Sequence, residues 1–137
     1  IAQLRLSKNF HFTGFLKGAE IHRVWSMSNV YVMPSVSEPF GIAPLEAFFH
    51  RLPVVATRIG ALPGFIRDGE NGRLVAPDDP RELASALLEL LSDPEKCRRF
   101  GEAGHALVSE NYTWEKTGER LRTGIEEALQ EYTGVPQ

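Results

Sequence analysis

The sequence predicts an α/β fold in which helices cover a parallel β-sheet. Two observations support this class. Short apolar runs of strand length alternate with segments of helical periodicity between residues 10 and 76. The rest of the chain is helical in pattern, with helix start signals at residues 79, 93 and 113. Alternation of strands and helices is typical of parallel sheets whose strands are joined by crossover helices.

The apolar runs place the elements of the first half. We expect strands near residues 10–14, 30–34, 53–57 and 73–76, and helices near residues 18–28, 43–50 and 61–66. The first six residues are expected to be the tail of a helix or a connector. In parallel sheets ligands bind beyond the carboxyl ends of the strands. The turns at residues 35–43 and 57–63 emerge at that edge and are therefore the candidate binding loops.

The helix after the second strand is predicted from one proline. Pro44 follows a glycine-containing turn, and proline is favoured at the first helical position because its φ is fixed and it has no N–H to satisfy. We therefore expect the helix to begin at residue 43 or 44. Gly41 lets the preceding backbone adopt φ values that other residues avoid and approach a ligand closely.

The later helices have strong start signals. Asp79-Pro80 supplies an N-cap and a first-position proline, with Glu82 three residues after the cap, and Asp93-Pro94 repeats the signal. Thr113 is expected to cap the last helix. The residues expected to be buried in these helices are Leu83, Ala84, Leu87, Leu88 and Leu91, then Cys97, Phe100, Leu107 and Val108, then Trp114, Leu121, Ile125, Ala128, Leu129 and Tyr132.

Composition indicates one compact domain over residues 1–137, since 42% hydrophobic residues suffice for a normal core. A net charge of −3 makes nucleic acid an unexpected partner. The single cysteine, Cys97, excludes an internal disulfide, and its place on an apolar helix face favours packing over a nucleophilic role. Because no apolar run reaches bilayer length, we expect a cytoplasmic protein, with attachment to the cytosolic face of a membrane left open.

Metal binding is not expected, because His11, His22, His50 and His105 are scattered along the sequence. The chemistry is concentrated in residues 37–47 instead. Glu38 and Glu46 lie eight positions apart around the turn that opens the helix. The free N–H groups of Gly41, Ile42 and Ala43 suit phosphate oxygens, while carboxylates accept hydrogen bonds from sugar and ribose hydroxyls. This arrangement predicts a nucleotide-sugar site.

Two alternatives remain open at this point. In the first, Glu46 only complements the helix dipole, Glu38 is a solvated loop acid and Gly41 is a turn residue. In the second, the two glutamates are the acid and base of a glycoside hydrolase, which requires carboxyl groups roughly 5 to 9.5 Å apart. One acid on a loop and the other within a helix argues against the second alternative.

These residues resemble the Glu-x7-Glu motif of retaining glycosyltransferases with the two-domain GT-B fold, specifically family 4 (group 1). Further segments are similar to motifs of the same family, from about residue 10 to residue 125: Phe12-Thr13-Gly14-Phe15, Pro53-Val54-Val55-Ala56, Asp68-Gly69-Glu70-Asn71-Gly72-Arg73-Leu74-Val75 and Tyr112-Thr113-Trp114-Glu115. Several motifs in the family's order are more specific than any single one.

The resemblance implies a Rossmann-like parallel sheet with helices on both faces and additional C-terminal helices, the C-terminal half of a GT-B enzyme. It implies that Glu46 binds the ribose and that Glu38, the catalytic residue, lies beside the donor sugar. The main chain at Phe40, Gly41, Ile42 and Ala43 would face the sugar and diphosphate. No metal or other cofactor is implied; the donor would be a UDP-, GDP- or ADP-sugar.

By this resemblance the full enzyme transfers a hexosyl group, with retention, to an acceptor glycan, lipid or small molecule held by an N-terminal domain. We expect the present chain to be a fragment that does not transfer sugar alone, and part of the final helix to face the other domain. A non-catalytic, regulatory nucleotide-sugar-binding domain is the alternative function. A receiver-like module is disfavoured because its acidic residues, Asp68, Asp78 and Asp79, lie in late loops.

The chain departs from the family pattern at two positions near the motif. Pro39 replaces a frequent glycine and should stiffen the loop. Arg51 stands where glycine usually ends the helix, so we expect an ordinary helical ending there.

Overall fold

The computed structural model describes residues 3–133, so the expectation for Ile1 and Ala2 lies outside the described residues. The sheet contains three parallel strands in the order β1-β2-β3. In chain order the elements are η1 (Ser7–Asn9), α1 (Ala19–Met27), β1 (Tyr31–Met33), α2 (Ile42–Phe49), β2 (Val54–Thr57), η2 (Leu62–Gly64), β3 (Gly72–Val75), α3 (Pro80–Leu91), α4 (Pro94–Asn111) and α5 (Trp114–Thr133).

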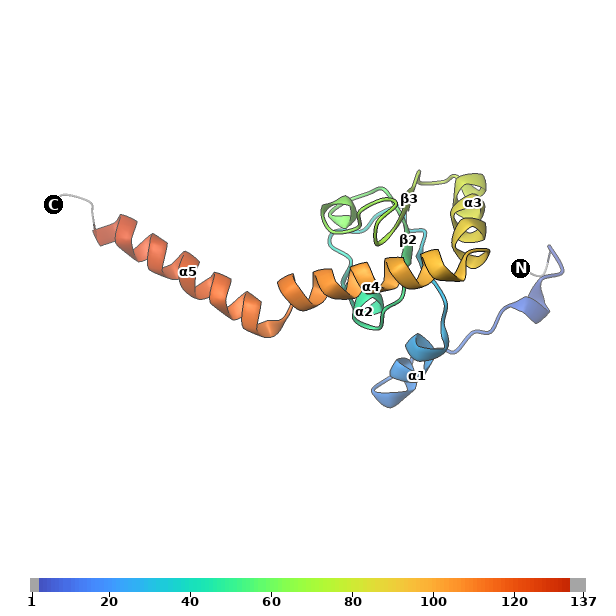
Figure 1. The fold of residues 1–137 in the computed structure, drawn as a ribbon, viewed down its shortest axis with the longest axis horizontal. Coiled ribbons are helices and arrows are strands. Elements are labelled where there is room, and N and C mark those ends of the chain that lie inside the picture. Colours follow the sequence, from blue (N-terminus) through green and yellow to red (C-terminus); the bar gives the residue numbers. More distant parts are fainter. Residues whose placement is uncertain (1–2, 134–137) are drawn as a thin grey trace.

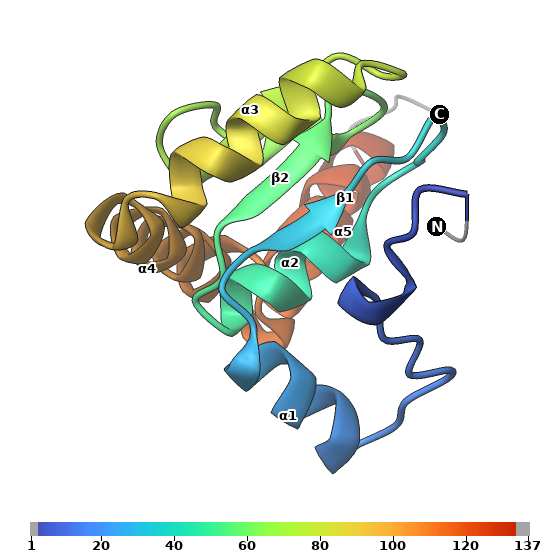
Figure 2. The same ribbon diagram turned by 90° about the vertical axis from the view of Figure 1, so that its right-hand side faces the viewer.

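Helices cover both faces of the sheet, which confirms the predicted α/β class. Figure 2 shows α3 over one face and α2 beneath the other. The strands supply both layers by alternation: Val54 and Ala56 pack with α2, whereas Val55 packs with Ala86 and Leu90 of α3. Successive side chains of a strand point to opposite faces, so a continuous apolar strand such as β2 is buried on both sides.

The start signals of the later helices act as predicted. The Asp79 carboxylate accepts hydrogen bonds from the N–H groups of Arg81 and Glu82, and Asp93 accepts one from Lys96, each about 2.9 Å long. Thr113 Oγ1 accepts a hydrogen bond from the N–H of Lys116 at 3.3 Å. These caps depend on neighbours two or three residues away, so the sequence alone is sufficient to predict them.

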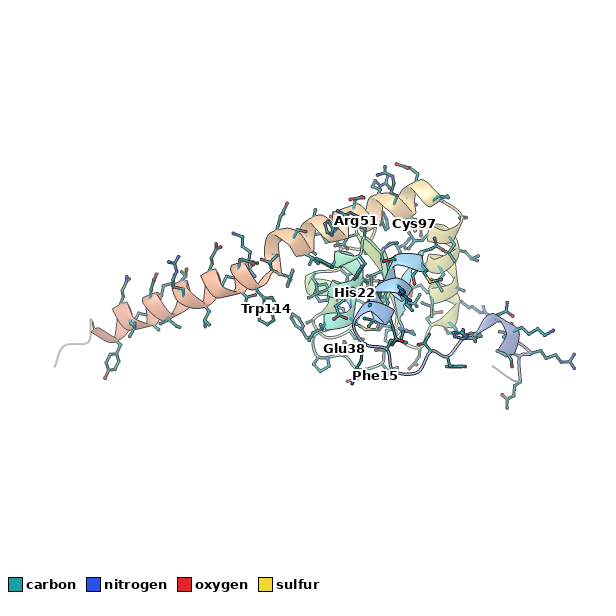
Figure 3. The ribbon with its side chains drawn as sticks, turned by 90° about the horizontal axis from the view of Figure 1, so that it is seen from below. Phe15, His22, Glu38, Arg51, Cys97 and Trp114 are labelled. Atoms are coloured by element: carbon teal, nitrogen blue, oxygen red, sulfur yellow. The ribbon has the colours of Figure 1, made fainter. Side chains whose placement is uncertain are left out.

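The predicted first strand at residues 10–14 is wrong. That segment forms no strand in the structure, and Phe10, Phe12 and Phe15 are exposed; Figure 3 labels Phe15. A strand is stable only when a neighbouring strand satisfies its N–H and C=O groups and an apolar layer covers its side chains. The three-stranded sheet supplies neither to residues 10–14.

The helix expected at residues 61–66 is only the single 3-10 turn η2. Pro63 and Gly64 within it both disfavour a longer α-helix. The strand expected at residues 73–76 is confirmed as β3, shifted by one residue.

The predicted apolar face of α3 is partly wrong. Ala86 and Leu90 are buried and Leu83 and Leu87 pack beside them, but Leu88 and Leu91 are 68% and 57% exposed. Ala84 is exposed as well. The helix carries two overlapping leucine stripes, and the sequence does not specify which one faces the sheet. On α4 the expectation holds better, since Phe100 and Val108 are buried and Cys97 and Leu107 are half-buried.

The apolar residues of the last helix were expected to be core, with part of this helix facing another domain, and the structure leaves all of them exposed. Figure 1 shows α5 extending away from the body, beyond the end of α4. Consequently its large apolar side chains are all more than half exposed: Trp114, Leu121, Ile125, Leu129 and Tyr132, together with the smaller exposed Ala128. Within residues 3–133, no helix combines the length and the apolar character needed to cross a membrane.

The end of α2 corrects the expectation for Arg51. This residue is left-handed, with φ of 57°. Its N–H donates to the carbonyl of Phe48, and the N–H of Leu52 donates to the carbonyl of Ala47. These two bonds form a Schellman ending, which favours glycine at the position of Arg51 because a side chain strains the left-handed backbone. The helix therefore ends as in a glycine-containing sequence, at a cost in backbone strain.

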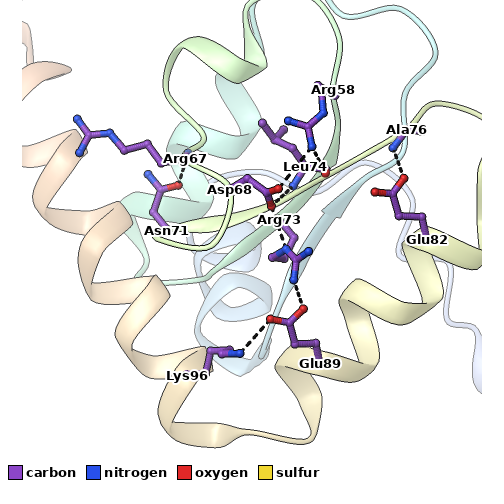
Figure 4. A network of polar contacts seen from close by, with 10 residues as sticks. All are labelled: Arg58, Arg67, Asp68, Asn71, Arg73, Leu74, Ala76, Glu82, Glu89 and Lys96. Carbon is purple, nitrogen blue, oxygen red and sulfur yellow. Dashed lines mark hydrogen bonds and ion pairs between the residues drawn. The ribbon is translucent and has the colours of Figure 1, made fainter.

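A network of polar contacts follows the outer strand β3 (Figure 4). One oxygen of Asp68 accepts hydrogen bonds from the N–H of Leu74 at 3.0 Å and from Arg73 Nε at 2.9 Å, and the other accepts one from Arg58 at 3.4 Å. Arg73 also contacts Glu89 of α3, which contacts Lys96 of α4. The Asp68 side chain thus binds a strand N–H, and the network links β3 to both helices.

Asp68 should make folding pH-dependent. Burial alone would raise the pKa of this carboxyl, but the hydrogen bonds from Leu74 and Arg73 more than offset it and leave the pKa below its ordinary value. A depressed pKa stabilises the fold above the unfolded value, about 4, and this stabilisation is lost as the pH falls through the folded value. Asp68→Asn should lower the free energy of unfolding by about 1 kcal/mol at pH 7 and flatten its fall between pH 5 and 3.

Urea unfolding followed by circular dichroism at pH 3, 4, 5 and 7 measures this effect. Glu70→Gln is the matched control, because the Glu70 side chain is two-thirds exposed and its ion pair is with the nearby, equally exposed Arg67. The control should follow the parent chain at every pH. An Asp68→Asn chain with the parent's pH slope would contradict the assignment.

Candidate functional site

The site is built around the first turn of α2. This helix begins at Ile42, so the predicted start near residue 43 or 44 is confirmed to within one residue, and Pro44 is the third helical residue. Proline is tolerated there because N–H groups throughout the first turn have no partner within the helix. Pro44 is instead buried in the core.

Gly41 is the N-cap of α2 and adopts φ of 93°. A Cβ on this residue would lie 2.5 Å from Cδ2 of Leu62, so the turn also packs tightly against η2. Both the left-handed backbone and the close approach require glycine. The predicted role of Gly41 as a residue of special backbone is therefore confirmed, although ligand contact is not tested.

The N-terminus of α2, like that of α1, has no side-chain cap among the described residues, whereas α3 and α4 are each capped by an aspartate. The first-turn N–H groups at Ile42 and Ala43 therefore lack the acceptor that α3 and α4 have. Such groups, together with the positive end of the helix dipole, form a site for an anion.

Glu38 lies on the loop between β1 and α2 and is half-buried. Its Oε1 accepts a hydrogen bond from the N–H of Phe40 at 3.2 Å. Thus Phe40, one of the four residues whose main chain was predicted to face a ligand, already donates its N–H to the protein's own carboxylate. The Phe40 N–H becomes available only if Glu38 turns away.

Glu46 is exposed on the second turn of α2. It lines a cavity of about 320 Å³ between α1 and α2 together with Gly18, Ile21, His22, Trp25, Phe49 and His50. A neighbouring cavity of about 390 Å³ shares Ile21 and Trp25 with it and is lined also by Tyr31 and residues 13–16. The predicted ribose-binding acid therefore stands at a hollow with aromatic walls.

Tyr31 shows that the two acids share one region. Burial raises the pKa of the Tyr31 phenol, and the negative charges of Glu38 and then Glu46 raise it further. Both carboxylates therefore act on the same hydroxyl group at the start of β1.

His50 adds a second group to the hollow beside Glu46. Its Nε2 lies 3.1 Å from Nδ1 of His22, and its ring stacks on Trp25 with centroids 6.0 Å apart. Burial and then the neighbouring His22 lower the pKa of His50, while the charge of Glu46 opposes that shift. His50 thus packs between α1 and α2, in contact with His22 and Trp25.

Two residues of the predicted turn at 57–63 make contacts that the sequence did not specify. Thr57, at the end of β2, is 3% exposed, and its hydroxyl donates to the carbonyl of Ser35 at 2.5 Å. Gly60 lies directly against the carbonyl of Glu38. Both belong to the second predicted binding loop, but only the parallel pairing of β1 with β2 brings that loop beneath the first one.

Other reactive groups do not form a site in residues 3–133. No group of three or more histidine, cysteine, aspartate or glutamate side chains there is placed to hold a metal ion. The Cys97 thiol donates to the carbonyl of Asn29 at 3.2 Å, and burial raises its pKa. A raised pKa disfavours the reactive thiolate, so Cys97 fits a packing role.

The chain can now be compared with known proteins. The sequence model of the family "Glycosyl transferases group 1" matches residues 1–107. An MMP alpha-(1->4)-mannosyltransferase from Mycolicibacterium hassiacum is 34% identical over 94% of the chain, which corresponds to 32% of that relative. The chain thus spans about a third of the length of this relative.

Solved structures agree in fold. A sucrose-phosphate synthase from Thermosynechococcus elongatus superposes with a TM-score of 0.87 at 29% identity, over 95% of this chain and 33% of that one. The C-terminal domain of a glycosyl transferase group 1 family protein, LpcC, from Francisella tularensis gives a TM-score of 0.75 at 34% identity, over 82% of this chain and 58% of that chain. These relationships confirm the predicted GT-B C-terminal half-domain. By sequence and by fold, this chain belongs to the glycosyl transferases group 1 family.

Proposed function

We propose that this chain is the donor-binding part of a retaining glycosyltransferase that transfers a hexosyl group from a nucleoside diphosphate sugar. The observation that carries the proposal is the uncapped N-terminus of α2, with Glu38 on the loop before it and Glu46 on the second turn after it. Main-chain N–H groups suit a diphosphate, and carboxylates suit hydroxyls. A nucleotide sugar carries both kinds of group in one molecule.

In the proposed complex the diphosphate lies at the N–H groups of Ile42 and Ala43. Glu46 accepts hydrogen bonds from the ribose hydroxyls at the rim of the hollow between α1 and α2, whose aromatic walls suit the base. Glu38 releases the N–H of Phe40 and turns to the hydroxyls of the donor sugar. The released N–H then joins those of the helix, so one rotation serves both the sugar and the phosphate.

During transfer, the bond from the anomeric carbon to the diphosphate oxygen breaks, a bond to the acceptor hydroxyl oxygen forms on the same face of the sugar, and the hydroxyl proton passes to the departing diphosphate. Negative charge grows on the departing diphosphate, where the α2 amides stabilise it without rearrangement. The work of these residues is therefore positional and electrostatic. No covalent bond between the sugar and Glu38 is required.

The acceptor and further basic groups for the diphosphate would be supplied by the rest of a longer protein. This part of the proposal is supported by length, since the chain corresponds to 32% of the mannosyltransferase and 33% of the sucrose-phosphate synthase described above. We expect the chain to bind a donor alone but not to transfer sugar. The base, the sugar and the acceptor are not specified by the residues described.

Titration of the ¹⁵N-labelled chain with UDP-glucose, GDP-mannose and ADP-glucose tests the proposal by NMR. At least one donor should shift the amide signals of Phe40, Gly41, Ile42 and Ala43, and the Phe40 signal should report loss of its bond to Glu38. Glucose 1-phosphate and free glucose are controls for simple anion or sugar binding and should shift them far less. Absence of amide shifts with all three donors would refute the proposal.

The catalytic part requires the full-length protein. There Glu38→Ala should abolish most transfer while leaving UDP binding intact, because Glu38 contacts the sugar and not the nucleotide. The anomeric proton coupling of the product reports retention or inversion. Unchanged turnover would remove Glu38 from the mechanism, and binding with no transfer in the parent protein would favour the regulatory alternative.

A further inference from the structure

Thr57 is a buried polar residue at the carboxyl end of the central strand. It is 3% exposed, in a strand whose other three residues are valine, valine and alanine, all fully buried. A β-branched aliphatic side chain such as valine would suit this position of the strand equally well. The hydroxyl therefore needs a reason beyond sheet formation.

The hydroxyl is used outside the sheet. Pairing between β1 and β2 ends at Met33 and Ala56, so Ser35 lies beyond the ladder. Thr57 Oγ1 donates to the carbonyl of Ser35 at 2.5 Å. This bond ties the start of the loop between β1 and α2 to the end of the neighbouring strand.

A second contact holds the same loop three residues further along. Gly60 has φ of 52°, and a Cβ on it would collide with the carbonyl oxygen of Glu38. The end of β2 and the loop after it therefore contact the loop of Glu38 at two points, Thr57 with Ser35 and Gly60 with Glu38. Both points lie within three residues of the carboxylate, so together they fix the main chain from which Glu38 extends.

We propose that Thr57 is a positioning residue for the donor site. Its hydroxyl, acting together with the close contact at Gly60, holds the loop of residues 34–41 in the place where Glu38 and the α2 amides face one ligand. The inference rests on the proposed function, because it assigns Thr57 a role toward the same donor. It adds that the second loop acts by supporting the first and not by touching the donor.

Loss of the Thr57 hydroxyl should change the mobility of the loop and the affinity for the donor, but not the folding of the core. Thr57→Val keeps the shape of the side chain but removes the donor to Ser35, so the loop should become mobile while the core stays folded. We expect a three- to tenfold loss of UDP-glucose affinity, because a loop that must be ordered on binding lowers affinity by that ordering. Thr57→Ser retains the hydroxyl and should restore most of the affinity.

The experiment measures affinity and loop mobility in the same chains. UDP-glucose titrations are followed by amide shifts, and ¹⁵N relaxation is recorded for Val36, Ser37 and Glu38 without ligand. Thr123→Val is the matched control, since it also removes a threonine hydroxyl bonded to a carbonyl, that of Glu119 on the distant α5. It should change neither quantity.

A double-mutant cycle links Thr57 to Glu38. If Thr57 acts partly through that carboxylate, Thr57→Val should lower the affinity of a Glu38→Gln chain by a smaller factor than it lowers the affinity of the parent chain. Independent, additive losses would overturn the inference, as would unchanged affinity and mobility in Thr57→Val. If Thr57→Val does not fold, Gly60→Ala takes its place, because it displaces the Glu38 carbonyl from the exposed side.

The outcome also separates this inference from the proposed function. If the parent chain binds no donor, the proposed function and the positioning role both fail. If the parent binds and Thr57→Val binds equally well, only the positioning role fails.

Discussion

Replacement of Glu46 by glutamine is expected to lower the affinity of the chain for its nucleotide-sugar donor by about 10- to 100-fold, the value of hydrogen bonds to a charged acceptor. Two adjacent ribose hydroxyls donate to the two oxygens of a carboxylate. Glutamine keeps the size of the side chain but offers one acceptor oxygen and an NH₂ group that cannot accept. The loss should be similar for every donor, since the ribose is common to all of them.

The fold should not change, because Glu46 is exposed on the surface of α2. This separates the two interpretations of the residue. If Glu46 only complemented the helix dipole, Glu46→Gln would lower stability by a few tenths of a kcal/mol and leave the affinity unaltered. Glu110→Gln, an exposed acid on α4, is the control and should bind the donor as the parent does. Isothermal titration with UDP and with UDP-glucose measures the affinities.

The same variant tests the geometry without any ligand. The charge of Glu46 raises the pKa values of both Tyr31 and His50, so its removal should lower both. NMR titration of the His50 ring protons and absorbance titration of the tyrosines measure these changes. If neither pKa moves, Glu46 does not face the hollow between α1 and α2, and its assignment to the ribose loses its structural basis.

Local chemistry made much of the fold predictable from the sequence. Asp79 and Asp93 predict the starts of α3 and α4, because a cap and the N–H groups that it accepts from lie within one turn. The glycine at residue 41 likewise marks a turn whose backbone other residues avoid. The predictions were wrong where an element depends on a distant neighbour. Residues 10–14 need a neighbouring strand, and α5 needs a surface that covers its apolar side. The expectation for Arg51 was wrong because the folded structure holds the end of α2 in a strained left-handed conformation.

In the candidate site, too, local residues were predictable and residues brought in by the fold were not. Glu38 and Glu46 stand out because they flank one turn, so their spacing is visible in the sequence. Thr57 and Gly60 are about 20 residues away from that loop and contact it only because β1 and β2 are parallel neighbours. The sequence marks residues 57–63 as a candidate binding loop, but it does not show which of them contact residues 35–38. Sequence patterns therefore predicted the groups proposed to touch a ligand, but not those that hold them.

The largest effect on folding is expected at Gly104 of α4. A Cβ on Gly104 would collide with the ring of Phe48, and one on Gly101, a turn earlier, with the carbonyl of Arg51. These glycines let α4 lie directly against α2, and Phe48 is fully buried at the contact. Gly104→Val must push the two helices apart or displace the ring. We expect a loss of about 3 kcal/mol or more, the upper end of overpacking, and a melting temperature at least about 10 °C lower.

Gly118→Val provides the matched control, because nothing lies within 4 Å of a Cβ at that position of α5. The same substitution there should leave the melting temperature within about 2 °C of the parent, since exposed sites tolerate such changes. Equal effects at the two positions would show that valine in a helix, and not the contact with Phe48, causes the loss. Because Phe48 belongs to the helix whose first turn forms the site, a Gly104→Ala chain that still folds should also bind the donor more weakly. The packing of α4 on α2 would then be part of what places the amides of Ile42 and Ala43.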